Sequence, residues 1–588
     1  MNILGSVAKG VSGAVFGSDA QGSSPEDLEV EALLGRVSDG VLSEDRREAL
    51  HSLRDSLLDN PKAQAAVGAM GFPVLAEVLR EDRDDVEMVR AALEVLVGAC
   101  TPVSSSDTEQ QQEVPVSSLN ADLFAREPAN AQLLLSLLDD EPVGIDDFYV
   151  RYHTVQLLTS LLSSSSYRLQ DAIMSSPMGV VRLMDMMMES EVIRNESLLL
   201  LIALTRANEE IQKIVAFEGA FERLFNIIRE EGALDGGIVV QDCLELLNNL
   251  LGGNSANQLM FREMGFVQQL TGMMKGSAPP ETFDVGLAFG QAVLPRQKAA
   301  NILCALETVM LLIVAHAAGG SNAAKPQAPE AMQLQEQNLV ANKELLVANG
   351  VLEILLELSL AEGGVRSSSV RVQAMRCMAT LVEHDDRNRD RFGSSLVRIA
   401  DQDIPTLQAL LRVALSADGA VERAAAQEVI RCYCVGNPDG QTMLASTLSP
   451  VSGSVDGGKG PSSFGSELAK ALVGGEDLLR SCRAAATLSY LLDGNPECKQ
   501  RILSIPLLLP ESSASPPELL MPRVVSYLAS SLRLPRARVP HPDPDGDRAR
   551  QARGRRRPRL GHGLRARCGL PRQRAAPGGT APPWLWRP

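Results

Sequence analysis

The stretch "CLELLNNLLGGNSANQLMFREMGFVQQLTGMM", residues 243–274, decides the fold because it sets two leucine-rich blocks on either side of a short polar hinge. With a helical period of about 3.6 residues, each block places its apolar residues on one face. The apolar positions are Leu244, Leu247, Leu250 and Leu251, then Leu259, Met260, Met264, Val267 and Leu270. In the hinge, Gly252 and Gly253 suit the left-handed residue that ends a helix. Asn254 or Ser255 can cap the next helix. Such a unit cannot bury its apolar stripe alone, so it requires similar neighbours.

The same order of elements recurs along the chain: an apolar helix, a turn with Asn, a helix, often a Gly, and another apolar helix. Further copies span 53–80, 201–228, 339–358 and, less regularly, 485–509. Asn208 and Asn254 lie 46 residues apart, as do Gly219 and Gly265. This spacing is typical of armadillo and HEAT repeats. The sequence therefore predicts an all-α fold, an armadillo/HEAT-like right-handed α-solenoid.

Composition supports a helical repeat protein of one elongated domain. Aromatic residues make up only 4% of the 588 residues, and Leu, Ala, Val and Met carry the apolar content, which disfavours a sheet-rich fold. We expect a flexible N-terminus over 1–26, the armadillo-like domain over 27–534 and a disordered Arg/Pro-rich tail over 535–588. The most apolar run, "ILCALETVMLLIVAHAA", is interrupted by Glu307 and is predicted to be a buried helix.

Candidate chemical motifs are weak throughout the chain. Cys432 and Cys434 have no His or second Cys pair at ligand spacing, so a core role is favoured over a zinc site. The stretch "GSVDGGKG" has the glycine and lysine spacing of a phosphate-binding loop, but Gly460 stands where Ser or Thr would hold magnesium. No HExxH or Gly-x-Ser-x-Gly motif occurs. We therefore predict no enzyme, no catalytic residues, no cofactor and no metal.

Peptide recognition of the nuclear-import type is disfavoured as well. Armadillo proteins of that type carry a ladder of Asn and Trp on successive inner helices, whereas residues 1–534 contain no Trp. Asn248 and Asn249 occur in one such helix only. We expect these two side chains to cap or cross-link helices locally.

Several blocks closely resemble the globular head of the general vesicular transport factor family, which are Golgi tethering proteins. These blocks are "DDFYVRY" at 146–152, "SPMGVVRLMDMMM" at 176–188, "EVIRNESLLLLIALTR" at 191–206, "IQKIVAFEGAFERLF" at 211–225 and "GGIVVQDCLELLNNLL" at 236–251. Three others, at 68–74, 440–448 and 482–492, look most like the plant and algal branch. The resemblance covers about residues 1–533.

The resemblance implies an armadillo-like head that forms a homodimer and binds a Rab-class small GTPase, SNAREs and other Golgi tethering proteins. It implies a vesicle-tethering scaffold in endoplasmic reticulum-to-Golgi and intra-Golgi transport, located in the cytoplasm and peripherally on Golgi membranes and vesicles. The alternative is another cytosolic armadillo adaptor, such as a chaperone cofactor or a transport receptor.

Partner-binding residues are predicted among the charged and polar positions inside the matching blocks. The candidates are Asp146, Asp147, Arg151, Arg182, Asp185, Arg194, Asn195, Glu196, Lys213 and Glu218. We choose them because an exposed charge in a strongly matching segment lacks a packing role. Helix caps and ion pairs between repeats are the alternative role for each of them.

Charge separates the body of the chain from its last segment. Residues 535–588 hold 14 Arg and 3 Asp, so the chain's net charge of −17 leaves −28 on residues 1–534. An acidic body is repelled by nucleic acid and by anionic lipid, so membrane contact should run through a protein. Residues 535–588 are rich in Arg, Pro, Ala and Gly without Lys, as expected of translation out of frame. We expect this segment to replace a coiled-coil continuation of the family.

Overall fold

The computed structural model describes most of the first of two compact units of the chain, Met1–Tyr527. The described residues are 25–102, 114–139, 144–275, 295–314, 329–360, 367–399, 402–448, 463–473, 477–507, 518–522 and 524–526. The predictions for the first 24 residues, for the phosphate-loop-like stretch and for the tail at 535–588 lie outside these ranges.

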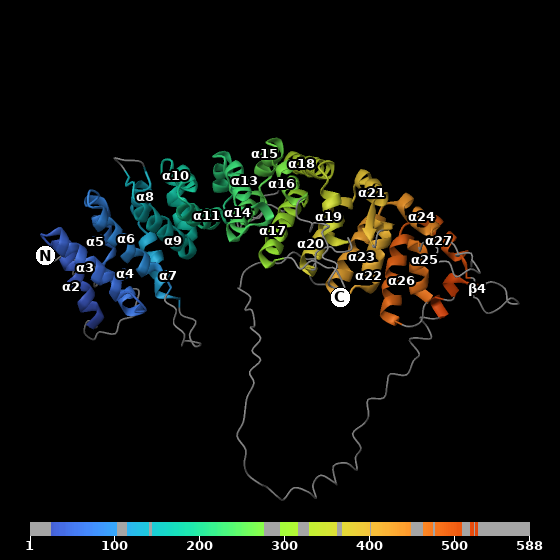
Figure 1. Cartoon of the computed structure of the whole chain (residues 1–588), viewed down its shortest axis with the longest axis horizontal. Helices are drawn as coiled ribbons and strands as arrows, with labels where there is room; N and C mark the ends of the chain where they lie inside the picture. Colours follow the sequence, from blue (N-terminus) through green and yellow to red (C-terminus); the bar gives the residue numbers. More distant parts are fainter. Residues whose placement is uncertain are drawn as a thin grey trace, which may run out of the picture. The chain divides into compact units, whose positions relative to one another are not determined.

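The described residues form repeats of up to three helices that follow one another in the order of the sequence (Figure 1). The first helices are α2 (Pro25–Asp39), α4 (Pro61–Met70), α7 (Val116–Ala125), α12 (Glu209–Phe217), α15 (Ser255–Glu263), α18 (Pro329–Ala348), α21 (Asp386–Gly393), α24 (Pro438–Ser446) and α27 (Pro496–Leu503). The second helices are α5 (Phe72–Glu81), α8 (Pro128–Leu137), α10 (Gly179–Asp185), α13 (Ala220–Glu230), α16 (Phe266–Lys275), α19 (Val351–Ser359), α22 (Thr406–Ser416) and α25 (Phe464–Val473).

The third helices form a continuous row in which each packs against the next. They are α3 (Ser43–Ser56), α6 (Val86–Cys100), α9 (Phe148–Ser175), α11 (Glu191–Thr205), α14 (Ile238–Leu251), α17 (Arg296–Ile313), α20 (Ser368–Val382), α23 (Ala420–Cys434) and α26 (Leu478–Leu492). Two short 3-10 helices, η1 (Met186–Met188) and η2 (Ala233–Asp235), follow α10 and α13. Because each repeat buries its apolar face mainly on its neighbours, the α-solenoid prediction is confirmed.

The opening stretch folds into α14, α15 and α16 as predicted, but the apolar face predicted for α15 is not the buried one: Leu259 and Met260 are only partly buried, and Phe261 is buried instead. Gly253 has a φ of +70°, in the left-handed region, and the Asn254 side chain accepts a hydrogen bond from the backbone N–H of Asn257 at 3.2 Å. Leu247 is fully buried. The placement of Met264 on the apolar face is wrong, because α15 ends at Glu263 and Met264 is 53% exposed in the following turn.

A ladder of buried amides joins successive repeats at the start of their first helices. The Asn254 amide caps α15 and also donates to Gln212 Oε1 of the previous repeat at 3.2 Å. Four residues after the cap, Gln258 donates to the carbonyls of Leu251 at 2.9 Å and Leu311 at 3.0 Å. The same arrangement recurs at Asn495, which donates to Gln441 Oε1 at 3.1 Å. Each amide satisfies carbonyls at helix ends that would otherwise be buried without a partner.

Helix α9 is continuous where other repeats have a break. Its 28 residues serve as the third helix of one repeat and the first helix of the next. Gln170, near its end, donates to the carbonyls of Leu204 and Arg206, as Gln258 donates to Leu311 of its following third helix. Its Oε1 accepts a hydrogen bond from Asn208 at 3.3 Å, as Gln212 Oε1 does from Asn254. The middle of α9, "SLLSSSSYRLQ", contains neither Gly nor Pro, so nothing ends the helix there.

Two short hairpins were not predicted. Strands β1 (Leu396–Ile399) and β2 (Gln402–Pro405) pair antiparallel, as do β3 (Pro506–Leu507) and β4 (Glu518–Leu519). Within the described ranges, no helix is long and apolar enough to cross a lipid bilayer. The apolar run containing Glu307 forms α17, which is buried along Ile302, Leu306 and Val309, as predicted.

Candidate functional site

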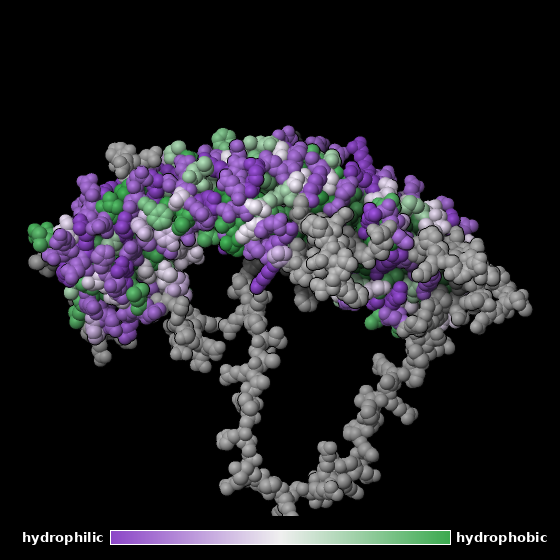
Figure 2. All heavy atoms as spheres, in the orientation of Figure 1, coloured by the Kyte–Doolittle hydropathy of each residue, from purple (hydrophilic) through white to green (hydrophobic). Residues whose placement is uncertain are grey.

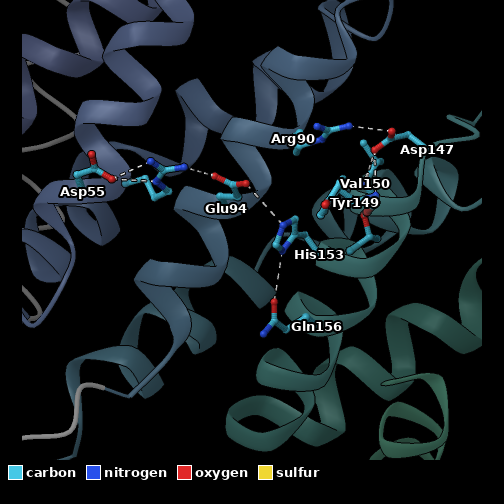
Figure 3. A network of polar contacts seen from close by, with 10 residues as sticks. Asp55, Arg90, Glu94, Asp147, Tyr149, Val150, His153 and Gln156 are labelled. Atoms are coloured by element: carbon cyan, nitrogen blue, oxygen red, sulfur yellow. Dashed lines mark hydrogen bonds and ion pairs between the residues drawn. The ribbon is translucent and has the colours of Figure 1, made fainter. Parts of the chain in front are cut away.

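Asp147 holds the start of α9 in place. Its Oδ1 accepts hydrogen bonds from the backbone N–H groups of Tyr149 and Val150, each at 3.0 Å, which caps the helix. Its Oδ2 accepts a hydrogen bond from Arg90 Nη2 of α6 at 2.9 Å. Figure 3 shows this pair bridging the two third helices. The first turn of α9 is therefore fixed both by a cap and by the preceding repeat.

The segment that follows carries a cluster of four rings, of which Phe148 and Tyr149 are exposed while Tyr152 and His153 are partly buried. Phe148 is 41% exposed and Tyr149 is 48% exposed. Phe148 stacks on Tyr152 with centroids 6.2 Å apart, and Tyr152 meets His153 edge-on at 5.2 Å. The Arg90 guanidinium lies over the Tyr149 ring at 4.5 Å. We call these four residues the aromatic cluster.

A chain of polar contacts runs from α3 through α6 to the aromatic cluster (Figure 3). Arg54 Nη1 donates to Glu94 Oε2 at 2.8 Å, and its Nη2 contacts Asp55 Oδ1 at 2.9 Å. Glu94 Oε1 lies 3.7 Å from His153 Nε2, and the other ring nitrogen lies 3.4 Å from Gln156 Oε1. This chain orients the imidazole and links three successive third helices.

The imidazole of His153 is held in its neutral form. Burial lowers the pKa of His153 below its usual value, and this effect outweighs the hydrogen bond with Gln156 and the nearby Glu94 carboxylate, which both raise it. Arg90 lowers it further. At neutral pH the cluster therefore presents an uncharged, ring-lined surface beside the exposed carboxylate of Asp146, which is 71% exposed.

The predicted residues at the start of α9 and α10 have internal partners. Arg151 is only 8% exposed and pairs with Glu189 and, at 3.3 Å, with Asp146. Arg182 of α10 pairs with Asp139, which follows α8. The expectation that these charges lack a packing role is wrong for both arginines, because each one joins adjacent repeats. Asp185 lies 3.6 Å from Arg223 of α13 and is 59% exposed.

The predicted residues on α11 and α12 divide into paired and unpaired groups. Arg194 pairs with Glu231 at 2.6 Å and donates to Asn195 Oδ1 at 3.2 Å. Lys213 pairs within its own helix with Glu209 at 2.9 Å and Glu210 at 3.3 Å. In the described part of the chain, neither Glu196 nor Glu218 forms an ion pair, and burial raises the pKa of Glu196. The ten residues therefore do not converge on one site.

Four of the buried cysteines are unsuited to nucleophilic chemistry. Burial raises the pKa of the Cys100, Cys377 and Cys434 thiols to about 12. Cys432, beside Cys434 in the sequence, is also buried, and its pKa is raised in the same way. These thiols are protonated at neutral pH and pack as small apolar groups. Across the ranges that the structure describes, no three His, Cys, Asp or Glu side chains gather as metal ligands.

Sequence reasoning selected the charges of "DDFYVRY" and passed over its rings. The signal was available, since three aromatic residues within five positions are unusual in a chain with 4% aromatic content. Arg54, Arg90 and Glu94 could not be found in this way, because packing of α3 and α6 brings them to α9 from more than 50 residues away in the sequence.

The sequence is similar to that of several known proteins. No family model matches the chain. Golgin candidate 6 of Arabidopsis thaliana is 43% identical over 534 residues, covering 90% of this chain and 55% of that protein. The general vesicular transport factor p115 of Homo sapiens is 32% identical over 525 residues, covering 88% of this chain and 50% of that protein. The chain thus spans about half the length of the curated relatives it matches.

Solved structures agree on the fold. A crystal structure of Uso1 aligns with a TM-score of 0.66 at 23% identity, covering 88% of this chain and 78% of that one. A second Uso1 structure aligns with a TM-score of 0.65 at 22% identity, covering 83% of this chain and 74% of that one.

The packing of successive repeats and the match to the Uso1 structures define the chain as an armadillo-like α-solenoid. Within this class the chain belongs to the general vesicular transport factor family, and its similarity to the Arabidopsis protein agrees with the resemblance to the plant branch.

Proposed function

We propose that this chain is the partner-binding head of a vesicle-tethering scaffold in endoplasmic reticulum-to-Golgi and intra-Golgi transport. It acts in the cytoplasm, peripherally on Golgi membranes and vesicles, as a homodimer. Its partners are a Rab-class GTPase, SNAREs and other tethering proteins. Support comes from the family, whose named members are vesicular transport factors, and from a fold that offers an extended surface.

One observation carries the proposal: the aromatic cluster on α9 is exposed and preorganised. Large rings held by Arg90 and Asp147 lose little conformational entropy when a partner covers them, and aromatic residues dominate protein-binding energetics. The Rab-class GTPase is the partner that we assign to this surface. The predicted residues Asp146, Asp147 and Arg151 border it, whereas the other predicted partner-binding positions lie on α10, on α11 and on or just after α12.

A nucleotide-dependent binding assay tests this function. The purified chain is incubated with a panel of purified Rab-class GTPases, each loaded with GTP analogue or with GDP. At least one should bind in the GTP form about tenfold more tightly, and Phe148→Ser with Tyr149→Ser should remove that binding. Leu479→Ser, at the second position of α26 and 69% exposed, is the matched control and should bind normally.

Two results would contradict the proposal. If no Rab-class GTPase binds in a nucleotide-dependent way, the alternative of another cytosolic adaptor replaces it. If binding is nucleotide-dependent but survives the double substitution, the function stands while the aromatic cluster is excluded as its surface.

A further inference from the structure

Three successive repeats share one turn conformation between their first and second helices. The turn after α9 has Met178 at a φ of +58°, the turn after α12 has Gly219 at +83°, and the turn after α15 has Gly265 at +81°. All three φ values lie in the left-handed region that favours glycine. The three turns are therefore structurally equivalent positions, one per repeat.

A large apolar side chain is exposed at or next to each of these turns: Met178 is itself the left-handed residue, Phe217 is the last residue of α12, and Met264 precedes Gly265. Met178 is 61% exposed, Phe217 is 78% exposed, and Met264 is 53% exposed. Helix α10 packs against α12, and α12 packs against α15, so the three turns belong to adjoining repeats. Figure 2 shows hydrophobic side chains along the edge that carries α10, α13 and α15 in Figure 1. We call Met178, Phe217 and Met264 the turn ridge.

The stability of the fold does not explain why these positions carry large apolar side chains. Met178 occupies a backbone conformation that costs energy for any residue except glycine, although the two equivalent turns use glycine. A side chain at Gly219 would meet no atom within 4 Å, so the site is open and nothing there needs to be filled. Phe217 leaves most of its ring in solvent, so it gains little from burial.

The turn ridge is bordered by negative charge. Glu222 is exposed and Glu218 is partly exposed beside Phe217, and Glu263, 66% exposed, precedes Met264. Arg223 donates to the Met184 carbonyl and pairs with Asp185, while Arg262 donates to Asn338 and Asn342 and also pairs with Glu263 at 3.1 Å. Among the described residues here, the uncompensated negative charge is therefore that of Glu218 and Glu222. An anionic membrane would be repelled here. A second copy of the chain would bring the same carboxylates face to face.

We propose that the turn ridge docks an amphipathic helix of another protein, whose apolar stripe is flanked by Lys or Arg. Adjacent helices in a solenoid lie about 10 Å apart. A helix rises about 1.5 Å per residue, so one laid across the three turns meets successive ridge side chains about every seven residues. Flexible methionines adapt to such a stripe, and the carboxylates pair with its basic flanks.

Defined probes test the proposal with the full chain. The first is a synthetic helical peptide of about 18 residues with leucine at seven-residue intervals and lysine beside the leucine stripe. A second peptide replaces each lysine with glutamate. Fluorescence anisotropy should show binding of the lysine peptide only. Met178→Ser, Phe217→Ser and Met264→Ser combined should weaken it about tenfold or more.

Two control variants separate binding from folding. Val41→Ser, Leu58→Ser and Leu479→Ser combined remove apolar side chains that are 96%, 72% and 69% exposed but lie beside α3 and in α26, outside the turn ridge, and should leave peptide binding unchanged. Met178→Gly should raise the melting temperature, because it removes the strain of a left-handed backbone at a residue other than glycine. It should still weaken peptide binding. A residue with only a structural role would not produce these opposite effects.

Other results would overturn the proposal. These are equal binding of both peptides, unchanged binding by the ridge variant, or loss of binding in the control variant. Binding to vesicles of phosphatidylcholine with about 20% phosphatidylserine, lost in the ridge variant, would make the ridge a membrane surface instead. Self-association in sedimentation, lost in the ridge variant, would make it a contact between copies. None of these outcomes depends on Rab binding, so this inference and the proposed function fail separately.

Discussion

The segment from α14 to α16 and the region around α9 connect the third helix of one repeat to the first helix of the next in different ways. The first ends α14 at Leu251, turns through Gly253, caps α15 with Asn254 and buries the rings of Phe261 and Phe266. The second runs through without a break and leaves Phe148 and Tyr149 in solvent at its start. The buried amides nevertheless share one contact, since Gln170 donates to Leu204 of its following third helix as Gln258 donates to Leu311 of its own. The two regions therefore share buried amide hydrogen bonds between repeats and differ in the side chains that they expose.

The largest effect is expected in the core of the regular repeat. Leu247→Asp would bury a carboxylate without a partner at a fully buried position, at a cost of about 4 kcal/mol or more. Urea unfolding should show a strongly destabilised protein with loosened adjacent repeats. Gln268→Ala, on the exposed side of α16, should change stability by less than about 0.5 kcal/mol. Wild-type unfolding of the Leu247 variant would contradict the helix register.

Removing one amide of the ladder should lower the free energy of unfolding by less than Leu247→Asp does. The loss should be the same in both regions. Gln258→Met and Gln170→Met keep the side-chain size but leave two carbonyls each without their donor. Each should lose about 1–3 kcal/mol in the free energy of unfolding. A much smaller loss at Gln170 would mean that α9 replaces the ladder rather than continuing it.

The aromatic cluster should matter little to stability. Phe148→Ser with Tyr149→Ser removes exposed rings and one contact with Arg90, so the free energy of unfolding should fall by less than about 1 kcal/mol. Circular dichroism melting checks this against Leu479→Ser. A loss of several kcal/mol would show that the rings hold α9 against α6, and the case for a binding surface would weaken.

The smallest effect is a pH dependence at His153. Its pKa is lowered in the folded protein, so the unfolded state binds a proton first as the pH falls. The stability associated with the neutral imidazole is complete above the unfolded pKa of about 6.5 and declines as the pH falls through that value toward the folded pKa. Comparing wild type with His153→Gln at pH 7.5 and 5.5 isolates this contribution. A wild type that loses no more stability than the variant would refute it.

Local signals in the sequence predicted much of the regular repeat. Asn254 and Gly253 act within a few residues of themselves, through a cap and a left-handed backbone, and Leu247 follows a periodicity read along one helix. Asn248 and Asn249 were expected to cross-link helices, and they donate to the carbonyls of Cys304 and Ile202 on the two neighbouring third helices. Met264 was misplaced because the turn shifts the helical phase by one residue.

Contacts between repeats could not be predicted in the same way. Arg151 and Arg194 were chosen as free surface charges, but their partners Glu189 and Glu231 lie 37 to 38 residues away in the sequence. Only the stacking angle between repeats decides which carboxylate a given arginine reaches. The same holds for Arg90, which contributes to the α9 site from another repeat.

By itself the sequence determined that this is a helical repeat protein, where its hinges and caps lie and to which family it belongs, because periodicity, glycine and asparagine act locally. The tertiary structure decided which charged side chains form ion pairs between repeats and which apolar side chains remain exposed to solvent. It alone placed Tyr149 under Arg90, and it alone left Met178, Phe217 and Met264 exposed in adjoining repeats. The physical reason is that burial and pairing are properties of neighbouring helices, and a solenoid creates those neighbours only when its repeats stack.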